Sequence, residues 1–274
     1  MTIPVLILNL RRSTARREQI SARLDALSIS HRFFDAIDGR SLSPNELERL
    51  APQSALLFER KLTPGEIGAA ASHIAAIHQL ANEKHDFACV MDDDAVMSAD
   101  LPLFLEPEAL NALPQFDVLR LVSDPARWKR PAWQIAHIHG RGIYAMARAG
   151  WGCQGQIYSR VGLRKMASQL NAVSAPADFM FYHDCHIAGL RIAEVRPGVI
   201  EHDQQEIYPE LRPFTDVGLR PVPDRQAMSF SDRMSRRRLR YRRKFMAIRG
   251  FIQAWGLGGL FHVFSWWPPG SYFR

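Results

Sequence analysis

The chain has 274 residues, of which 47% are hydrophobic and 23% are charged, and this composition excludes a disordered chain. Its net charge of +7 is uneven: residues 229–274 carry +9, so residues 1–228 carry −2. We therefore expect a globular body at residues 1–228, a basic tail at residues 229–274, and no nucleic-acid binding by the body.

The N-terminal apolar run, residues 3–8, is too short for a signal peptide and precedes its arginines, so we expect no export signal. The three cysteines, Cys89, Cys153 and Cys185, are too scattered for a disulfide framework or a metal motif. We expect buried thiols in a reducing compartment.

The body begins with alternating predicted strands and helices. Residues 5–10 form a short apolar run typical of a buried parallel strand, residues 14–27 predict a helix, and residues 31–40 predict a second strand that ends in a turn. Two Ser/Thr-Pro-x-Glu segments, at residues 43–46 and 63–66, indicate capped helix starts, the second opening a helix to about residue 84. An α/β fold follows from this alternation.

The stretch FACVMDDDAV places three consecutive carboxylates directly after an apolar run that we predict to be a strand. Like charges about 4 Å apart repel by about 1 kcal/mol even in water. Open α/β sheets bind ligands beyond the carboxyl ends of their strands. Asp92 and Asp94 therefore predict a site for Mn²⁺ or Mg²⁺, shared with a diphosphate. The alternative is an acidic surface turn or a helix cap.

Two metal-dependent chemistries use such an Asp-x-Asp pair. A phosphatase of the haloacid-dehalogenase type matches Asp92, Asp94 and Val96, with the first Asp as nucleophile and the second as acid/base. A nucleotide-sugar transferase instead uses the pair to hold a metal on the leaving diphosphate. About ninety residues precede the motif and no convincing later pair of acidic ligands follows it, which favours the transferase.

Four ordered segments, VLILNLRRSTARR, FFDAIDGR, LTPGEIGAAASHIAAI and VMDDDA, resemble glycosyltransferase family 25. This family includes bacterial lipopolysaccharide and lipooligosaccharide galactosyltransferases. The resemblance continues through FDVLRLVS, GWGCQGQIYSRVGLRKM and PADFMFYHD to VRPGVIEHD, and so covers about residues 3–203. The Glu-Asp-Asp of the family is Asp92-Asp93-Asp94 here, which preserves the Asp-x-Asp pair.

This resemblance implies a GT-A-like nucleotide-sugar-binding domain with a central, mostly parallel sheet. It implies inverting transfer of a hexose, galactose first, from a UDP-sugar to a glycan or glycolipid acceptor of lipopolysaccharide or a related surface glycan. The donor-binding residues that it implies are Asn9, Arg16, Gly65, Ser72, His73, Asp92, Asp93 and Arg120.

Several of these residues also have structural interpretations. His73 is equally consistent with a core histidine that has one ring nitrogen bonded. Arg120 lies inside an apolar segment, where an unpaired arginine is costly, so it is either a sugar or phosphate ligand or the partner of Asp117 or Asp124.

Inverting transfer needs a general base for the acceptor hydroxyl. The resemblance assigns this role to Asp178, with Asp184 as a second catalytic candidate, although Asp178 after Ala-Pro-Ala also has the sequence of a helix N-cap. His202 is a candidate third metal ligand, at a position where the family more often has glutamine.

The tail joins an arginine-rich block to an aromatic one. Residues 250–267 are uncharged, but their glycines argue against a spanning helix. We expect a helical tail on an anionic membrane surface, at the inner face of a bacterial cytoplasmic membrane. The alternatives are a nucleic-acid arm and a helix packed on the body. A non-catalytic, membrane-associated adaptor with a transferase-like body is the remaining alternative for the whole chain.

Overall fold

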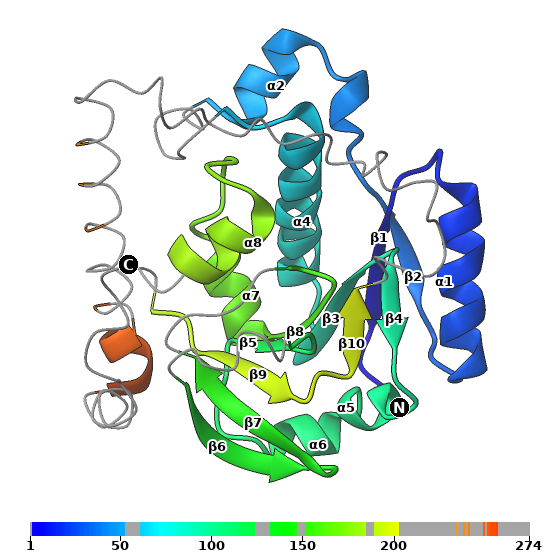
Figure 1. Cartoon of the computed structure of the whole chain (residues 1–274), viewed down its shortest axis with the longest axis vertical. Coiled ribbons are helices and arrows are strands. Elements are labelled where there is room, and N and C mark those ends of the chain that lie inside the picture. Colours follow the sequence, from blue (N-terminus) through cyan, green and yellow to red (C-terminus); the bar gives the residue numbers. More distant parts are fainter. Residues whose placement is uncertain are drawn as a thin grey trace.

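The computed structural model describes residues 2–52, 61–123, 132–146, 152–184 and 189–202, and in the tail residues 234, 238, 241, 249 and 251–256. Within these ranges one sheet has eight strands in the order β2-β1-β3-β8-β5-β9-β7-β6 (Figure 1). Their bounds are β1 Val5–Asn9, β2 Arg32–Asp35, β3 Phe87–Asp92, β5 Val118–Arg120, β6 Ala132–Ile138, β7 Arg141–Met146, β8 Gly155–Ser159 and β9 Ile192–Arg196. A second sheet pairs β4 (Ala95–Met97) with β10 (Ile200–His202).

The central sheet is mixed, with most strands pointing the same way. The pairs β1–β2, β1–β3 and β5–β9 are parallel, whereas β8 and β7 run antiparallel to their neighbours. β8 and β7 thus oppose the other six strands. The expected α/β class with a mostly parallel sheet is confirmed, and the insertion of β8 between β3 and β5 is a feature that local patterns did not predict.

Helices cover both faces of this sheet (Figure 1). One face packs against α1 (Thr14–Ala26), α5 (Leu101–Phe104) and α6 (Pro107–Asn111). The other face packs against α4 (Pro64–Asn82), α7 (Arg160–Ala167), α8 (Ala177–Phe179) and the π-helical turn η3 (Met180–Asp184). Both predicted capping boxes are confirmed, Ser43 with Glu46 at α2 (Pro44–Leu50) and Thr63 with Glu66 at α4.

Two glycines let the turn after β2 lie directly on α4. A Cβ atom at Gly39, in the 3-10 turn η1 (Gly39–Ser41), would lie 1.8 Å from the Pro64 carbonyl oxygen. A Cβ atom at Gly68 would lie 2.5 Å from the Ile37 carbonyl oxygen. Only glycine fits where two backbones approach this closely.

In the tail, residues 251–256 are helical and pack on the body. Phe251 and Ala254 are buried, and the ring of Trp133 on β6 lies edge-on to the rings of Phe251 and Trp255, at 5.1 and 5.6 Å between centroids. Arg191 Nε donates to the Ala254 carbonyl at 2.9 Å. For these six residues, the alternative of a helix packed on the body is correct.

None of the helices that the structure describes is both long and apolar enough to span a bilayer. Most of the basic and aromatic stretch on which the membrane prediction depends lies outside the described residues. The membrane surface and the boundary at residue 229 therefore stay predictions. The buried thiols are confirmed for Cys89 and Cys153, and Cys185 lies outside the described residues.

Candidate functional site

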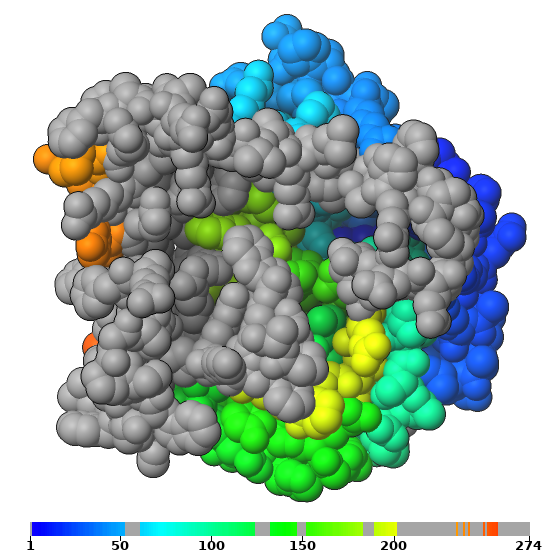
Figure 2. All heavy atoms as spheres, viewed as in Figure 1, coloured from blue at the N-terminus to red at the C-terminus, as the bar shows by residue number. Residues whose placement is uncertain are grey.

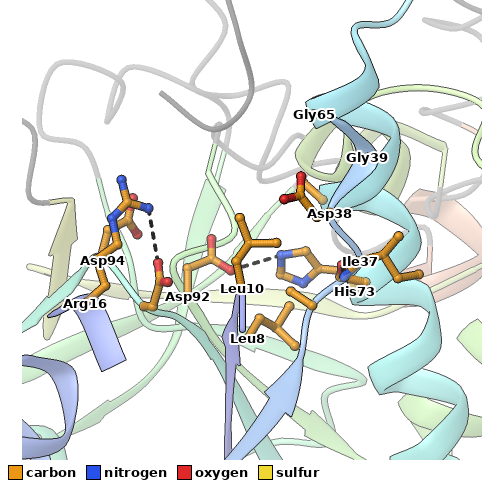
Figure 3. Close-up of a pocket in the computed structure, with 14 residues that line it drawn as sticks. Leu8, Leu10, Arg16, Ile37, Asp38, Gly39, Gly65, His73, Asp92 and Asp94 are labelled. Carbon is orange, nitrogen blue, oxygen red and sulfur yellow. Dashed lines mark hydrogen bonds and ion pairs between the residues drawn. The ribbon is translucent and has the colours of Figure 1, made fainter. Parts of the chain in front are cut away.

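A pocket opens at the carboxyl ends of β1 and β3, between the turn after β2 and the N-terminal half of α4 (Figure 3). Parallel strands carry their ligand sites at this end of a sheet. Seven of the residues singled out in the sequence line it, namely Arg16, Gly65, Ser72, His73, Asp92, Asp93 and Asp94. Leu8, Ile37, Asp38 and Gly39 also line it, and they were not singled out because they belong to apolar runs or to the turn.

Asp92 is the last residue of β3 and faces His73 of α4 across the pocket (Figure 3). The distance from His73 Nε2 to Asp92 Oδ1 is 3.1 Å, and the His73 side chain is 5% exposed. The Phe181 ring lies edge-on to the imidazole at 5.7 Å, while Nδ1 has no hydrogen-bond partner among the described residues. His73 is thus both a packed core histidine and a residue that orients a pocket carboxylate.

The Asp93 carboxylate contacts one side chain at the end of β1 and one in the first turn of α1. Asn9, the last residue of β1, donates from Nδ2 to Asp93 Oδ2 at 2.7 Å and to the Ser13 carbonyl at 3.2 Å. Arg16 Nη1 lies 3.4 Å from Asp93 Oδ1. Asn9 and Arg16, which are far from the three aspartates in sequence, therefore both contact the middle one, Asp93.

Asp94 lies in an acidic environment; the residue is half-buried, and its Oδ1 atom is shielded from solvent. Burial first, and then the Asp92 and Asp93 carboxylates, raise the pKa of Asp94 from 3.8 to about 7. Among the described residues, no three His, Cys, Asp or Glu side chains converge as a ready-made metal site. Two neighbouring carboxylates with excess negative charge nevertheless fit a hard divalent cation that takes its other ligands from phosphate oxygens and water.

Ser72 and Gly65 belong to the wall formed by α4. Ser72 Oγ donates to the Gly68 carbonyl at 2.7 Å and accepts from the Ile37 amide at 2.8 Å, so it ties the turn after β2 to the helix. Gly65 lies in the first turn of α4, where backbone N–H groups and the helix dipole favour negative charge.

The segment 152–154 connects the triplet to Asp178. The Asp92 amide donates to the Gln154 carbonyl at 3.1 Å, and the Gly152 amide donates to Asp178 Oδ2 at 3.2 Å. Between them, burial raises the pKa of the Cys153 thiol well above its usual value, and the Asp178 and Asp92 carboxylates raise it further. Residues 152–154 therefore link the backbone of Asp92 to the carboxylate of Asp178.

The N-cap interpretation of Asp178 is wrong, because the cap of α8 is Pro176 and Asp178 lies within the first turn. Its Oδ1 accepts from the Phe179 amide at 2.8 Å. Asp178 is partly buried and is not among the residues that line the pocket.

Arg120 also lies away from the pocket lining. It is 2% exposed and forms an ion pair with Glu194 of β9. The expected pairing with Asp117 is wrong, because Asp117 Oδ2 accepts from Lys165 Nζ at 2.7 Å, and Asp124 lies outside the described residues. Glu194 was missed, although a carboxylate between the apolar residues of IAEV was a signal of the same kind as Arg120.

Only the backbones of Asp184 and His202 are described. Asp184 ends the turn η3, shortly after Asp178. His202 ends β10 and stands opposite Ala95 of β4 in antiparallel register, which places its backbone next to the residue that follows Asp94. Figure 2 shows residues of β10 and β4 side by side on this face of the molecule.

Comparison with known proteins gives a family, and similarities to a curated protein and to a solved structure. The model of the family described as "Glycosyltransferase family 25 (LPS biosynthesis protein)" matches residues 2–181. A Haemophilus influenzae protein named "Putative glycosyltransferase" is 22% identical over 204 residues, which are 72% of this chain and 69% of that protein. A crystal structure of a mutant Drosophila beta-1,4-galactosyltransferase 7 in complex with manganese, UDP-Gal and xylobiose is 11% identical. The match covers 77% of this chain and 78% of the galactosyltransferase chain, with a TM-score of 0.39.

Proposed function

Because this chain belongs to glycosyltransferase family 25, we propose that it transfers a hexose with inversion from a UDP-sugar to a sugar acceptor of lipopolysaccharide or a related surface glycan. Galactose is the first candidate for the hexose, and a GT-A-like arrangement is the proposed architecture. The observation that carries the proposal is the convergence of Asp92, Asp93 and Asp94 with Asn9, Arg16 and the start of α4 around one pocket.

Arg16 and the first turn of α4 are the proposed contacts of the donor diphosphate. An arginine offers a planar fork of donors that suits phosphate oxygens, and a helix N-terminus favours the same charge. At position 65 the pocket wall carries no side chain, because the residue there is glycine. The turn after β2, with Asp38 and Gly39, bounds the pocket opposite the triplet.

Asp92 and Asp94 are the proposed protein ligands of Mn²⁺ or Mg²⁺, with His202 as a third candidate because β10 brings its backbone beside β4. When bound, the metal would neutralise charge that develops on the leaving diphosphate. His73 holds the Asp92 carboxylate in one orientation, which is the usual contribution of residues behind metal ligands.

Asp178 is the proposed general base, with Asp184 as the second candidate. The Asp178 carboxylate takes the proton of the acceptor hydroxyl while that oxygen bonds to the anomeric carbon. The bond from the anomeric carbon to the diphosphate breaks, and its electron pair leaves with UDP. Attack opposite the leaving group inverts the anomeric centre.

A thermal-shift screen tests the donor and the metal together. We expect UDP-galactose or UDP-glucose to raise the melting temperature with Mn²⁺ present, and to raise it much less with a chelator. UDP release that requires a lipopolysaccharide extract then tests transfer. Phosphate release from p-nitrophenyl phosphate without an acceptor would favour the phosphatase, and no response to any nucleotide sugar would favour the inert adaptor.

The basic tail is the proposed contact with an anionic membrane at the inner face of the cytoplasmic membrane. Each basic residue near such a surface contributes about 1 kcal/mol, and this attraction is screened by salt. Co-sedimentation with anionic liposomes across a salt series should be lost on deletion of residues 229–274. A chain ending at residue 256, which keeps the helical residues packed on Trp133, is the matched control.

A further inference from the structure

A row of polar side chains crosses five neighbouring strands of the sheet. The register pairs Gln156 of β8 with Arg120 of β5, Arg120 with Glu194 of β9, Glu194 with Tyr144 of β7, and Tyr144 with Gln134 of β6. Residues paired in this way point to the same face of a sheet. Gln156, Arg120 and Glu194 are each at most 3% exposed.

The centre of this row is a buried ionic cluster. Glu194 pairs through Oε2 with Arg120 and through Oε1 with Arg196, whose Nε lies at 2.9 Å. The Arg120 guanidinium also lies over the Tyr182 ring, 4.4 Å from its centroid. Burying each ion costs several kcal/mol, and apolar side chains of similar volume are often at least as stabilising. Stability alone therefore does not explain why this sheet contains the cluster.

Arg120 has a contact toward the site that Arg196 lacks. Arg120 Nη2 donates to the Gly152 carbonyl at 3.3 Å, and the Gly152 amide donates to Asp178 Oδ2 at 3.2 Å. Gly152 has a φ of 93°, a backbone conformation that favours glycine. Arg196 instead contacts Met146 Sδ and the Tyr144 ring.

We propose that Arg120 is a positioning residue for catalysis: Glu194 holds its guanidinium, which fixes Gly152, and Gly152 fixes the Asp178 carboxylate relative to Asp92. The next link along the chain supports this arrangement, because the Gln154 carbonyl accepts the Asp92 amide. Arg120 thus acts on the reaction without touching the substrate. The inference rests on the proposed function, in which Asp178 is the base and Asp92 holds the donor metal.

Arg120 and Arg196 form a matched pair for the test. Both are buried arginines on the same carboxylate, so Arg120→Met and Arg196→Met each leave Glu194 with one cationic partner. In the full chain, with UDP-galactose, Mn²⁺ and a lipopolysaccharide extract, we expect similar falls in melting temperature for the two variants. We expect kcat to fall by about 10- to 100-fold in Arg120→Met, with the donor KM within about twofold. Arg196→Met should keep kcat within about twofold.

Equal losses of kcat in the two variants, or a rise in KM alone for Arg120→Met, would overturn the proposal. If Arg120→Met does not fold, Arg120→Lys replaces it in the same assay. Its single ammonium group keeps a charge near Glu194 but lacks the second arm that holds Gly152, so kcat should again fall more than the melting temperature predicts. Normal kcat in a folded Arg120→Lys would also overturn the proposal.

A double variant separates this proposal from the proposed function. If Arg120 acts through Asp178, Arg120→Met should lower kcat little further in an Asp178→Asn background. Multiplied losses would overturn the positioning role alone. Full activity in Asp178→Asn would show that the base lies elsewhere, and the positioning role that rests on Asp178 would fail with it.

Discussion

The end of β3 and the cluster around Glu194 bury charge in opposite ways. At the end of β3, burial first, and then the Asp92 and Asp93 carboxylates, raise the pKa of Asp94 to about 7, so three like charges gather there. Across the sheet, Glu194 is held between Arg120 and Arg196. A group of like charges indicates a place for a ligand of the opposite charge, whereas a carboxylate held by two guanidinium groups indicates fixed geometry.

The largest expected effect is on transfer by Asp92→Asn and Asp94→Asn. Each should lower kcat/KM by at least about 10³-fold, because each removes a charge that holds the metal on the leaving diphosphate. Circular dichroism should show an intact fold. Asp35→Asn is the control, since Asp35 is an exposed partner of Arg11 outside the pocket. Full activity in both pocket variants would refute the metal assignment.

The next prediction tests whether the functional site extends from the three aspartates after β3 to Asp178. Asp178→Asn should lower kcat by about 10²- to 10⁴-fold, the usual contribution of a general base, with little change in donor affinity. Steady-state kinetics and donor titration measure the two separately. If donor binding collapses instead, Asp178 is a donor ligand and Asp184 becomes the first candidate for the base.

The paired charges around Glu194 should respond to the loss of their shared carboxylate with a loss of stability. Glu194→Leu leaves two buried guanidinium groups without their shared partner, and should lower the free energy of unfolding by about 3–5 kcal/mol. Denaturant unfolding measures this loss. The contrast is Glu83→Gln, which breaks a partly exposed pair with Arg32 and should cost less than about 1 kcal/mol. Similar losses in the two variants would contradict the ionic interpretation of the cluster.

The smallest expected effect is a gain in folding stability instead of a loss. Because the pKa of Asp94 is raised from 3.8 to about 7 in the folded protein, the unfolded chain releases this proton first as pH rises. Folding stability therefore falls between those two pKa values and levels off above pH 7. In metal-free protein, Asp94→Asn should raise the melting temperature by at least about 2 °C at pH 8, and by less at pH 5. A gain that is largest at pH 5 would contradict this environment.

Sequence predicted best those features that depend on neighbouring residues. The capping boxes, the apolar run of β1 and the strand that ends at Asp92 were all found, because each signal lies within a few residues. The pairing of Arg120 with Glu194 was not found, since it depends on the register of β5 with β9 across 74 positions of sequence. The family resemblance supplied the candidate site residues. It did not reveal the contacts that link Asp92 to Asp178 through residues 152–154.

The backbone contact of Gly39 and Gly68 has a consequence for the thermodynamics of donor binding. It joins one wall of the pocket to a 19-residue helix before any ligand arrives. A wall that became ordered only on binding would reduce affinity by about 1–2 kcal/mol for each residue whose backbone is fixed. Because folding has already ordered residues 36–39, the donor meets a surface whose conformational entropy was lost before binding.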